Sequence, residues 1–151
     1  MGKLIKRVII HWTAGNYKAN ATDKKAYHYI VEDDGKIVKG VYTPVDNINC
    51  RDGRYAAHAL NHNTGSIGVA IACRKDEFTQ PTRKQVEAMC ELVATLCRKY
   101  EIDIGKNTVL THAEIDPKRK IDINNLPCVA VYGSQNVGEW LRNKVLWYSR
   151  K

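Results

Sequence analysis

One stretch of the chain, from Ser66 to Cys73, constrains the possible folds more than any other. It reads S-I-G-V-A-I-A-C, an unbroken run of small, apolar and β-branched residues without a charge. A strand with one face in water alternates apolar and polar residues, whereas a run of this kind is typical of a strand buried on both faces. The stretch therefore predicts an interior strand of a sheet.

Further strands are predicted on either side of this one. The segment Lys6–Thr13 contains an apolar, β-branched run and predicts another buried strand. An Asp34-Gly35 turn separates two short apolar runs, which is a strong hairpin signal. The expected hairpin strands are Tyr27–Val31 and Ile37–Val41, and a last short strand is Asn107–Thr111.

Two helices are predicted in the second half of the chain. Thr82 is followed three residues later by Gln85, the pattern of a capping box, and an apolar stripe of helical spacing follows. The stripe consists of Val86, Met89, Cys90, Val93, Cys97 and Tyr100. Ser134 is the expected cap of the last helix, whose inward residues are Val137, Trp140, Leu141 and Val145. The segment Asn16–Lys25 has little periodicity and predicts a loop that could include one helical turn.

The chain length and the net charge further narrow the fold class and the kind of partner. A chain of 151 residues predicts one domain over residues 1–151, and the alternation of elements predicts an α/β fold with a mixed central β-sheet flanked by helices. The net charge of +8 favours an acidic partner, which could be nucleic acid, an anionic membrane or an anionic cell-wall polymer. Charge alone does not choose among these three.

Cysteine usage and hydropathy bear on the compartment. The five cysteines are odd in number and form no C-x-x-C, which argues against a disulfide framework and against a cysteine-cage zinc site. The apolar run near the N-terminus is too short for a secretory signal, and no transmembrane stretch occurs. We therefore expect synthesis in a reducing cytoplasm. Cys128 follows Pro127 and is the cysteine expected nearest to the site described next.

The segment Thr111–Asp122, T-H-A-E-I-D-P-K-R-K-I-D, carries the densest set of reactive side chains. Pro117 disfavours a helix at Asp116, so the residues after His112 are expected to form an ordered loop that crosses back over the site. In an extended loop Lys120 and Asp122 would share one face and point into a cavity, with Ile121 pointing into the core.

Three possible metal ligands come from different segments. His11 lies at the end of one predicted strand, His112 lies at the end of another, and Asp122 lies on the crossing loop. Two imidazoles and a carboxylate suit a catalytic zinc site, in which water takes the fourth position. The alternative is a structural histidine beside a solvated run of charges, since histidines also occur as plain surface features.

Four sequence blocks in order resemble the type 2 N-acetylmuramoyl-L-alanine amidases, a family that includes small phage lysozymes, recycling amidases and peptidoglycan recognition proteins. The blocks are I-I-H-W-T-A-G, Y-H-Y-I-V-E-D-D-G-K-I, A-A-H-A-L-N-H-N-T-G-S-I-G-V and T-H-A-E-I-D-P-K-R-K-I-D. The resemblance implies that zinc is bound by His11, His112 and Asp122. It also implies that Lys120 stabilises the transition state and that Tyr27 lies beside the metal-bound water.

The chain departs from the family pattern in three places. Some members carry a glutamate where this chain has Ala70, so the chain is similar to the tyrosine-using branch; since tyrosine has a pKa of about 10, a water-orienting role is expected for Tyr27. The segment between His11 and Tyr27 is shorter than usual, which predicts a reduced wall of the substrate groove. Aligning on the proline would select Lys118 as the functional lysine, but the spacing to the third ligand favours Lys120.

Other polar residues have less certain roles. The long segment Thr43–Thr64 is rich in turn residues and predicts a functional surface loop. Its His58 is a candidate substrate-binding residue, with loop ordering as an equal alternative. Structural or surface roles are expected for His28 and His62. Glu114 would either orient a neighbour or form a surface salt bridge.

The leading hypothesis is a monomeric zinc amidase that acts on peptidoglycan or muropeptides, with Zn2+ as cofactor and no separate wall-binding module. A phage or prophage endolysin is the first choice, acting on the cell wall after release, and a recycling amidase acting on cytosolic muropeptides or a delivered effector stays open. The alternatives are a peptidoglycan-binding module without turnover and a basic nucleic-acid-binding protein. No specific nucleic-acid partner is expected, because the basic residues are scattered and form no basic helix.

Overall fold

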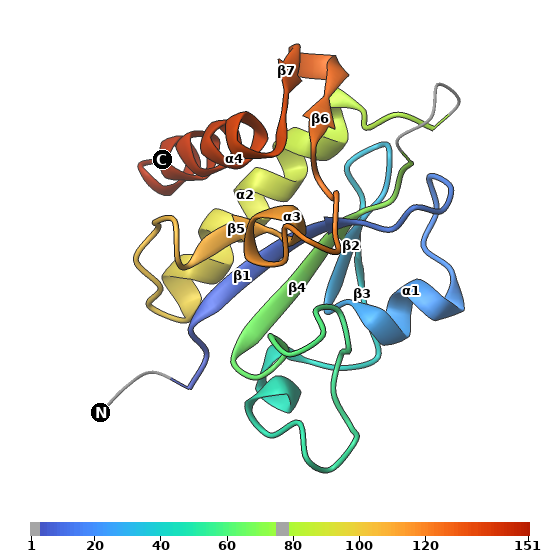
Figure 1. Ribbon diagram of the computed structural model, residues 1–151, viewed down its shortest axis with the longest axis vertical. Helices are drawn as coiled ribbons and strands as arrows, with labels where there is room; N and C mark the ends of the chain where they lie inside the picture. The colour runs from blue at the N-terminus through green and yellow to red at the C-terminus, as the bar shows by residue number, and fades with distance from the viewer. Residues whose placement is uncertain (1–3, 75–78) are drawn as a thin grey trace.

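The computed structural model describes residues 4–74 and 79–151 and is built around a five-stranded mixed sheet (Figure 1). The strands are β1 (Arg7–Trp12), β2 (Tyr29–Val31), β3 (Ile37–Lys39), β4 (Ser66–Ile71) and β5 (Val109–Thr111). Their order across the sheet is β3-β2-β4-β1-β5. The hairpin strand β3 pairs antiparallel with β2, and the other neighbours are parallel. The α/β fold with a mixed central sheet is thereby confirmed.

Strand β4 lies inside the sheet between β1 and β2, and all of its residues are buried. Its side chains alternate between the two faces. Ile67, Val69 and Ile71 belong to the main hydrophobic core. Gly68 and Ala70 therefore face the other side, where side chains of β1 such as Ile9 form a smaller apolar cluster with Ala59 and Leu110. This second face carries the candidate site.

The main core is covered by two helices that lie against each other, α2 (Arg83–Lys99) and α4 (Ser134–Ser149) (Figure 1). The predicted capping box of α2 is confirmed, with Thr82 accepting from the backbone N–H of Gln85. Gln85 is fully buried, and its amide donates to the backbone oxygens of Val31 and Ala72 at 2.8 Å each. It therefore ties α2 to the sheet.

Two helix predictions were wrong in detail. Ser134 is the first residue of α4, and the cap is Gly133, which makes no side-chain hydrogen bond. The segment predicted as a loop that could include one helical turn contains the six-residue helix α1 (Ala21–Ala26), which is longer than one turn. Its start is a capping box formed by Asn20 and Asp23, a local signal that periodicity alone does not detect.

Five short elements were not predicted, four of them in the C-terminal half of the chain. The residues after β5 form one helical turn, α3 (His112–Ile115), before the expected loop begins. The strands β6 (Asn125–Leu126) and β7 (Val131–Tyr132) pair into a two-stranded sheet beside the main one. The 3-10 turn η2 (Pro127–Val129) connects them, and a second turn of this kind, η1 (Pro44–Ile48), lies in the long loop after β3.

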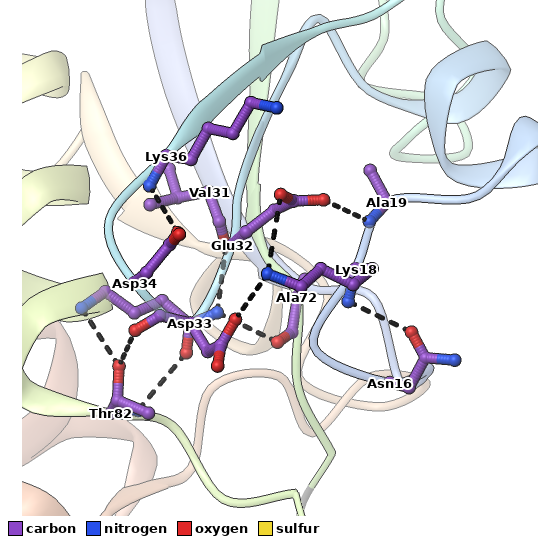
Figure 2. A network of polar contacts seen from close by, with 11 residues as sticks. Asn16, Lys18, Ala19, Val31, Glu32, Asp33, Asp34, Lys36, Ala72 and Thr82 are labelled. Carbon is purple, nitrogen blue, oxygen red and sulfur yellow. Dashed lines mark hydrogen bonds and ion pairs between the residues drawn. The ribbon is translucent and has the colours of Figure 1, made fainter.

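A polar network anchors the segment that precedes α1 to the hairpin turn (Figure 2). Glu32 is buried and accepts from the backbone N–H of Ala19 at 2.8 Å, and Lys18 lies 3.1 Å from a carboxylate oxygen of Asp33. The Thr82 hydroxyl donates to the backbone oxygen of Asp33 at 2.6 Å, which links the turn to the start of α2. The chain between β1 and α1 is therefore held by the hairpin turn, which is itself tied to the start of α2.

The long loop between β3 and β4 is held by two buried or half-buried asparagines. Asn47 accepts from the backbone N–H of Ala56 at 2.9 Å and donates to its backbone oxygen at 2.9 Å. Asn63 accepts from the backbone N–H groups of His58 and Ala59 at 3.0 and 2.8 Å.

Among the described residues, no helix is long and apolar enough to cross a membrane.

Candidate functional site

The inner strand β1 and its neighbour at the sheet edge, β5, bring the two candidate histidine ligands together. β1 and β5 are parallel neighbours, with Ile10 opposite Thr111, so His11 and His112 leave the sheet at the same edge. His11 lies on the same face of β1 as Ile9, opposite the main core. Helix α3 begins at His112 and lies in front of β1 in Figure 1. The Nδ1 atoms of the two rings are 3.0 Å apart.

A partly buried ion pair between Arg142 of α4 and Glu114 holds the helical turn that carries His112. Thr111 caps the turn by accepting from the backbone N–H of Glu114, and the Glu114 carboxylate accepts from the backbone N–H of Thr111 at 2.9 Å. The same carboxylate oxygen accepts from Arg142 at 2.9 Å, and this guanidinium also donates to the backbone oxygen of Val109. Glu114 therefore orients a neighbouring group, one of the two roles left open for it.

Replacing Arg142 by methionine should destabilise the protein by about 2 kcal/mol, because the Glu114 carboxylate and the Val109 oxygen would each lose a hydrogen bond to a charged donor. Urea denaturation measures the loss, with Arg98→Met as the control because Arg98 is exposed on α2. A loss no larger than that of the control would contradict the anchoring role of α4.

Asp122 completes a cluster of three buried donor groups. Its carboxylate oxygens lie 3.3 Å from Nδ1 of His11 and 3.5 Å from Nδ1 of His112. Zinc binds nitrogen and oxygen donors at about 2.0–2.2 Å in tetrahedral sites, which separates any two donors by roughly 3.3 Å. The spacings of the three donors therefore fit one zinc ion, and among the described residues this is the one group of its kind that could hold a metal.

The electrostatics of the cluster suit cation binding. Burial, with a smaller contribution from the charge of Lys120, outweighs the opposing effect of Asp122 and lowers the pKa of His11 to about 4, so the imidazole is neutral at physiological pH. Burial alone would raise the pKa of Asp122, but its contacts with His11 and His112 outweigh burial and hold that pKa well below its usual range. The Asp122 carboxylate therefore places a negative charge beside the two imidazoles, which a divalent cation would neutralise.

A cavity of about 500 Å³ opens above the cluster. Tyr27, His58 and Lys120 line it with His112 and Asp122, while the His11 ring lies beneath, 5.1 Å from the ring centre of Tyr27. Burial, followed by the charges of Asp122 and Asp23, raises the pKa of Tyr27, so its phenol stays protonated. The structure thus brings together all six predicted site residues.

The crossing loop differs from its prediction at Ile121. This side chain is 53% exposed and lines the cavity, and Ile123 is the residue that enters the core. The expected alternation fails because the chain turns at Asp122 and does not run as an extended strand. Lys118 is exposed and does not line the cavity, whereas Lys120 does.

Cys128 is not near the cluster, contrary to expectation. It is half-buried, packs against the main core and does not line the cavity. The cavity wall also contains residues that the sequence did not single out, of which Arg119 had a signal in the run Lys118-Arg119-Lys120 and the rest had none. They are Trp12, Thr13, Ala14, Ala57 and Arg119.

His58 and His28 form side-chain contacts below the cavity. His58 is 6% exposed, and its Nδ1 lies 2.9 Å from Nε2 of His11. Its Nε2 lies 3.1 Å from the backbone oxygen of Ser66. His28 bonds to Asn47 and to the backbone N–H of Gly68, as expected for a structural histidine.

Comparison with known proteins gives one family and a set of similar folds. The family model described as N-acetylmuramoyl-L-alanine amidase matches residues 1–125. No curated protein matches the chain. The family match covers all three candidate ligands, His11, His112 and Asp122, which fall within the matched residues.

Three solved structures illustrate the similarity of the fold. The amidase AmiD from E. coli, in complex with anhydro-N-acetylmuramic acid-L-Ala-D-gamma-Glu-L-Lys, is 25% identical over 93% of this chain and 57% of that chain, with a TM-score of 0.65. The Ph2119 endolysin from a Thermus scotoductus bacteriophage is 18% identical over 86% and 85% of the two chains, with a TM-score of 0.56. The drosophila peptidoglycan recognition protein SD is 22% identical over 74% and 71%, with a TM-score of 0.52.

Proposed function

The chain belongs to the N-acetylmuramoyl-L-alanine amidase family, and from this premise we propose that it hydrolyses the amide bond between N-acetylmuramic acid and L-alanine in a zinc-dependent reaction. The observation that carries the proposal is the cluster of His11, His112 and Asp122, buried below the 500 Å³ cavity and spaced for one ion. In a family member without a metal site, nothing would favour burying three such donor groups side by side.

The protein's own residues supply binding and orientation. His11, His112 and Asp122 would hold the ion, and zinc bound there supplies a Lewis acid and a water whose pKa is about 7. With one carboxylate among three ligands, the loaded site keeps a net positive charge. That charge favours the oxyanion that develops on the carbonyl oxygen of the substrate amide.

Two cavity residues take the remaining roles in this proposal. Lys120 places an ammonium beside the ligands and stabilises the developing oxyanion. Tyr27 donates a hydrogen bond from a phenol that stays protonated, so it orients water or substrate and does not act as the general base. The chain has Ala70, opposite His11 on β4, where some relatives place a glutamate.

We assign the activity to a phage or prophage endolysin that degrades the bacterial cell wall. The similarity of the fold to the bacteriophage endolysin supports this assignment, and the net charge of +8 suits a wall that carries phosphates and carboxylates. Comparing the hydrolysis of muropeptides with that of intact wall distinguishes a recycling amidase, which would prefer the muropeptides.

Mass spectrometry of purified sacculi tests the proposed reaction. Sacculi incubated with the protein and zinc should release free stem peptides that begin with L-alanine. The same incubation after verified metal removal by a strong chelator should release none, and activity should return when zinc is added back. Cleavage of glycan strands would overturn the choice of bond, and full activity without metal would overturn the role of zinc.

A peptidoglycan-binding module without turnover is the second candidate function. The similarity of the fold to a drosophila peptidoglycan recognition protein favours it. Cosedimentation of the zinc-loaded protein with sacculi, without any released peptide, would support this candidate in place of the amidase.

Replacing Tyr27 by phenylalanine should lower turnover by about 10- to 100-fold, the equivalent of one hydrogen bond to a charged group. Zinc content and the melting temperature should stay the same, because the phenol is not among the three grouped donors. Tyr29→Phe is the matched control, since Tyr29 is half-buried on β2 and does not line the cavity. Equal turnover of the two variants would remove Tyr27 from the reaction.

A further inference from the structure

His58 contacts the proposed metal ligand His11 from below, at the ring nitrogen that faces away from the other two ligands. Nδ1 of His11 points at His112 and Asp122, and Nε2 of His11 lies 2.9 Å from Nδ1 of His58. The two rings meet edge to face, with ring centres 5.0 Å apart. Both nitrogens of His11 are therefore committed, one to the cluster and one to His58.

The direction of the hydrogen bond between His11 and His58 follows from the contact that His58 makes at its other ring nitrogen. Nε2 of His58 lies 3.1 Å from the backbone oxygen of Ser66, and a carbonyl oxygen can only accept. Nε2 of His58 must therefore carry a proton. Because the ring is 6% exposed, a doubly protonated and charged form would be costly, so Nδ1 of His58 is bare and accepts.

The proton in the contact between the two histidines therefore belongs to His11. A neutral imidazole carries one proton, so a proton on Nε2 leaves the Nδ1 lone pair free, and that lone pair is the one directed at the cluster. The reverse arrangement, with the proton on Nδ1 of His11, would let that nitrogen donate to Asp122, 3.3 Å away, but would set two lone pairs against each other at Ser66, where no cation can take the place of the proton. His112 shows no comparable constraint, since its Nε2 has no hydrogen-bond partner among the described residues.

The surroundings hold the His58 ring in this position. A Cβ added at Gly68 would lie 2.5 Å from Cγ of His58, so the ring occupies the space that the missing side chain leaves on the second face of the sheet. Asn63 holds the backbone of His58, and the ring of His28 packs against it at 5.7 Å between ring centres. The loop residue is thus fixed from three sides.

We propose that His58 is a positioning residue that holds His11 in the tautomer whose Nδ1 can bind metal. The inference rests on the proposed zinc site and gives His58 a role beyond the two predicted for it, substrate binding and loop ordering. Metal-binding histidines are commonly oriented by a partner on the other ring nitrogen, whose loss typically costs about 10- to 100-fold in metal affinity. Here the partner is another histidine, His58, and the backbone oxygen of Ser66 in turn sets the tautomer of His58.

Nitrogen NMR of the metal-free wild-type protein at neutral pH tests the tautomer directly. His11 should be protonated at Nε2 and bare at Nδ1, and His58 should be protonated at Nε2. A proton on Nδ1 of His11 would overturn the proposal. This measurement needs no variant and no turnover, so it stands even if the protein fails to release peptides from sacculi.

Zinc affinity, measured by competition with a chelator, tests the consequence. His58→Leu should weaken zinc binding by about 10- to 100-fold, and His58→Asn, which keeps an acceptor near the position of Nδ1, should recover most of the loss. His62→Leu is the matched control, because His62 lies in the same loop outside the cavity lining. Zinc binding by His58→Leu within twofold of wild type would contradict the proposal.

Discussion

Replacing Asp122 by alanine should remove bound zinc and turnover together. Asp122 is 7% exposed and supplies the only carboxylate of the three grouped donors, at 3.3 and 3.5 Å from the two imidazoles. Loss of a partner that merely orients a ligand costs about 10- to 100-fold in metal affinity, and loss of the ligand itself should cost more. The two imidazoles would be left to hold the ion, without the negative charge that attracts it.

Zinc stoichiometry and peptide release from sacculi, measured on the same preparation, check this result. Asp116→Ala is the matched control, because Asp116 lies in the same loop but pairs with Arg119 outside the cluster. The control should keep both metal and turnover. Tightly bound zinc in Asp122→Ala would mean that the third ligand lies elsewhere, and Cys128 is then an unsuitable substitute because it packs against the main core.

Replacing Lys120 by alanine should leave the metal in place and lower turnover by about 10²–10³-fold, or roughly 3–4 kcal/mol of barrier. The side chain lines the cavity, and its charge acts on His11, but it is not one of the donors. The substitution therefore removes the positive charge of Lys120 from beside the developing oxyanion. It leaves the coordination of the zinc ion unchanged. The expected separation of metal content from turnover distinguishes Lys120 from Asp122.

The neighbouring Lys118 provides the control for this prediction. It is exposed and does not line the cavity, so Lys118→Ala should retain turnover within about twofold, as expected for a surface change away from the site. Wild-type turnover in Lys120→Ala together with lost turnover in Lys118→Ala would show that the functional lysine had been assigned two residues too late.

Local patterns in the sequence determined most of the elements. The uninterrupted run at Ser66–Ile71, the Asp34-Gly35 turn and the Thr82 capping box each act over a few residues, and each gave the element observed. Two further capping boxes were also readable, Asn20 with Asp23 and Thr111 with Glu114, but they begin helices too short to show a periodic stripe. Periodicity needs several turns, whereas a cap needs only four residues.

The order of four motifs along the chain also sufficed to name the family and to select His11, His112 and Asp122. Such motifs are short, and each is tied to a strand end or a turn that the local sequence predicts. Their convergence was an expectation from the family resemblance, and the register of β1 with β5 supplies its physical cause, since it sets His11 beside His112.

Only the tertiary structure decided how the site residues are used. Ile121 lies in the cavity and Ile123 in the core because the loop turns at Asp122, which a rule of alternation does not foresee. Arg142 reaches Glu114 from 28 residues away, and His58 reaches His11 from 47 residues away. The sequence determined which groups the chain carries and which strands deliver them, whereas their hydrogen-bond partners depend on contacts between segments that become neighbours only after the sheet has formed.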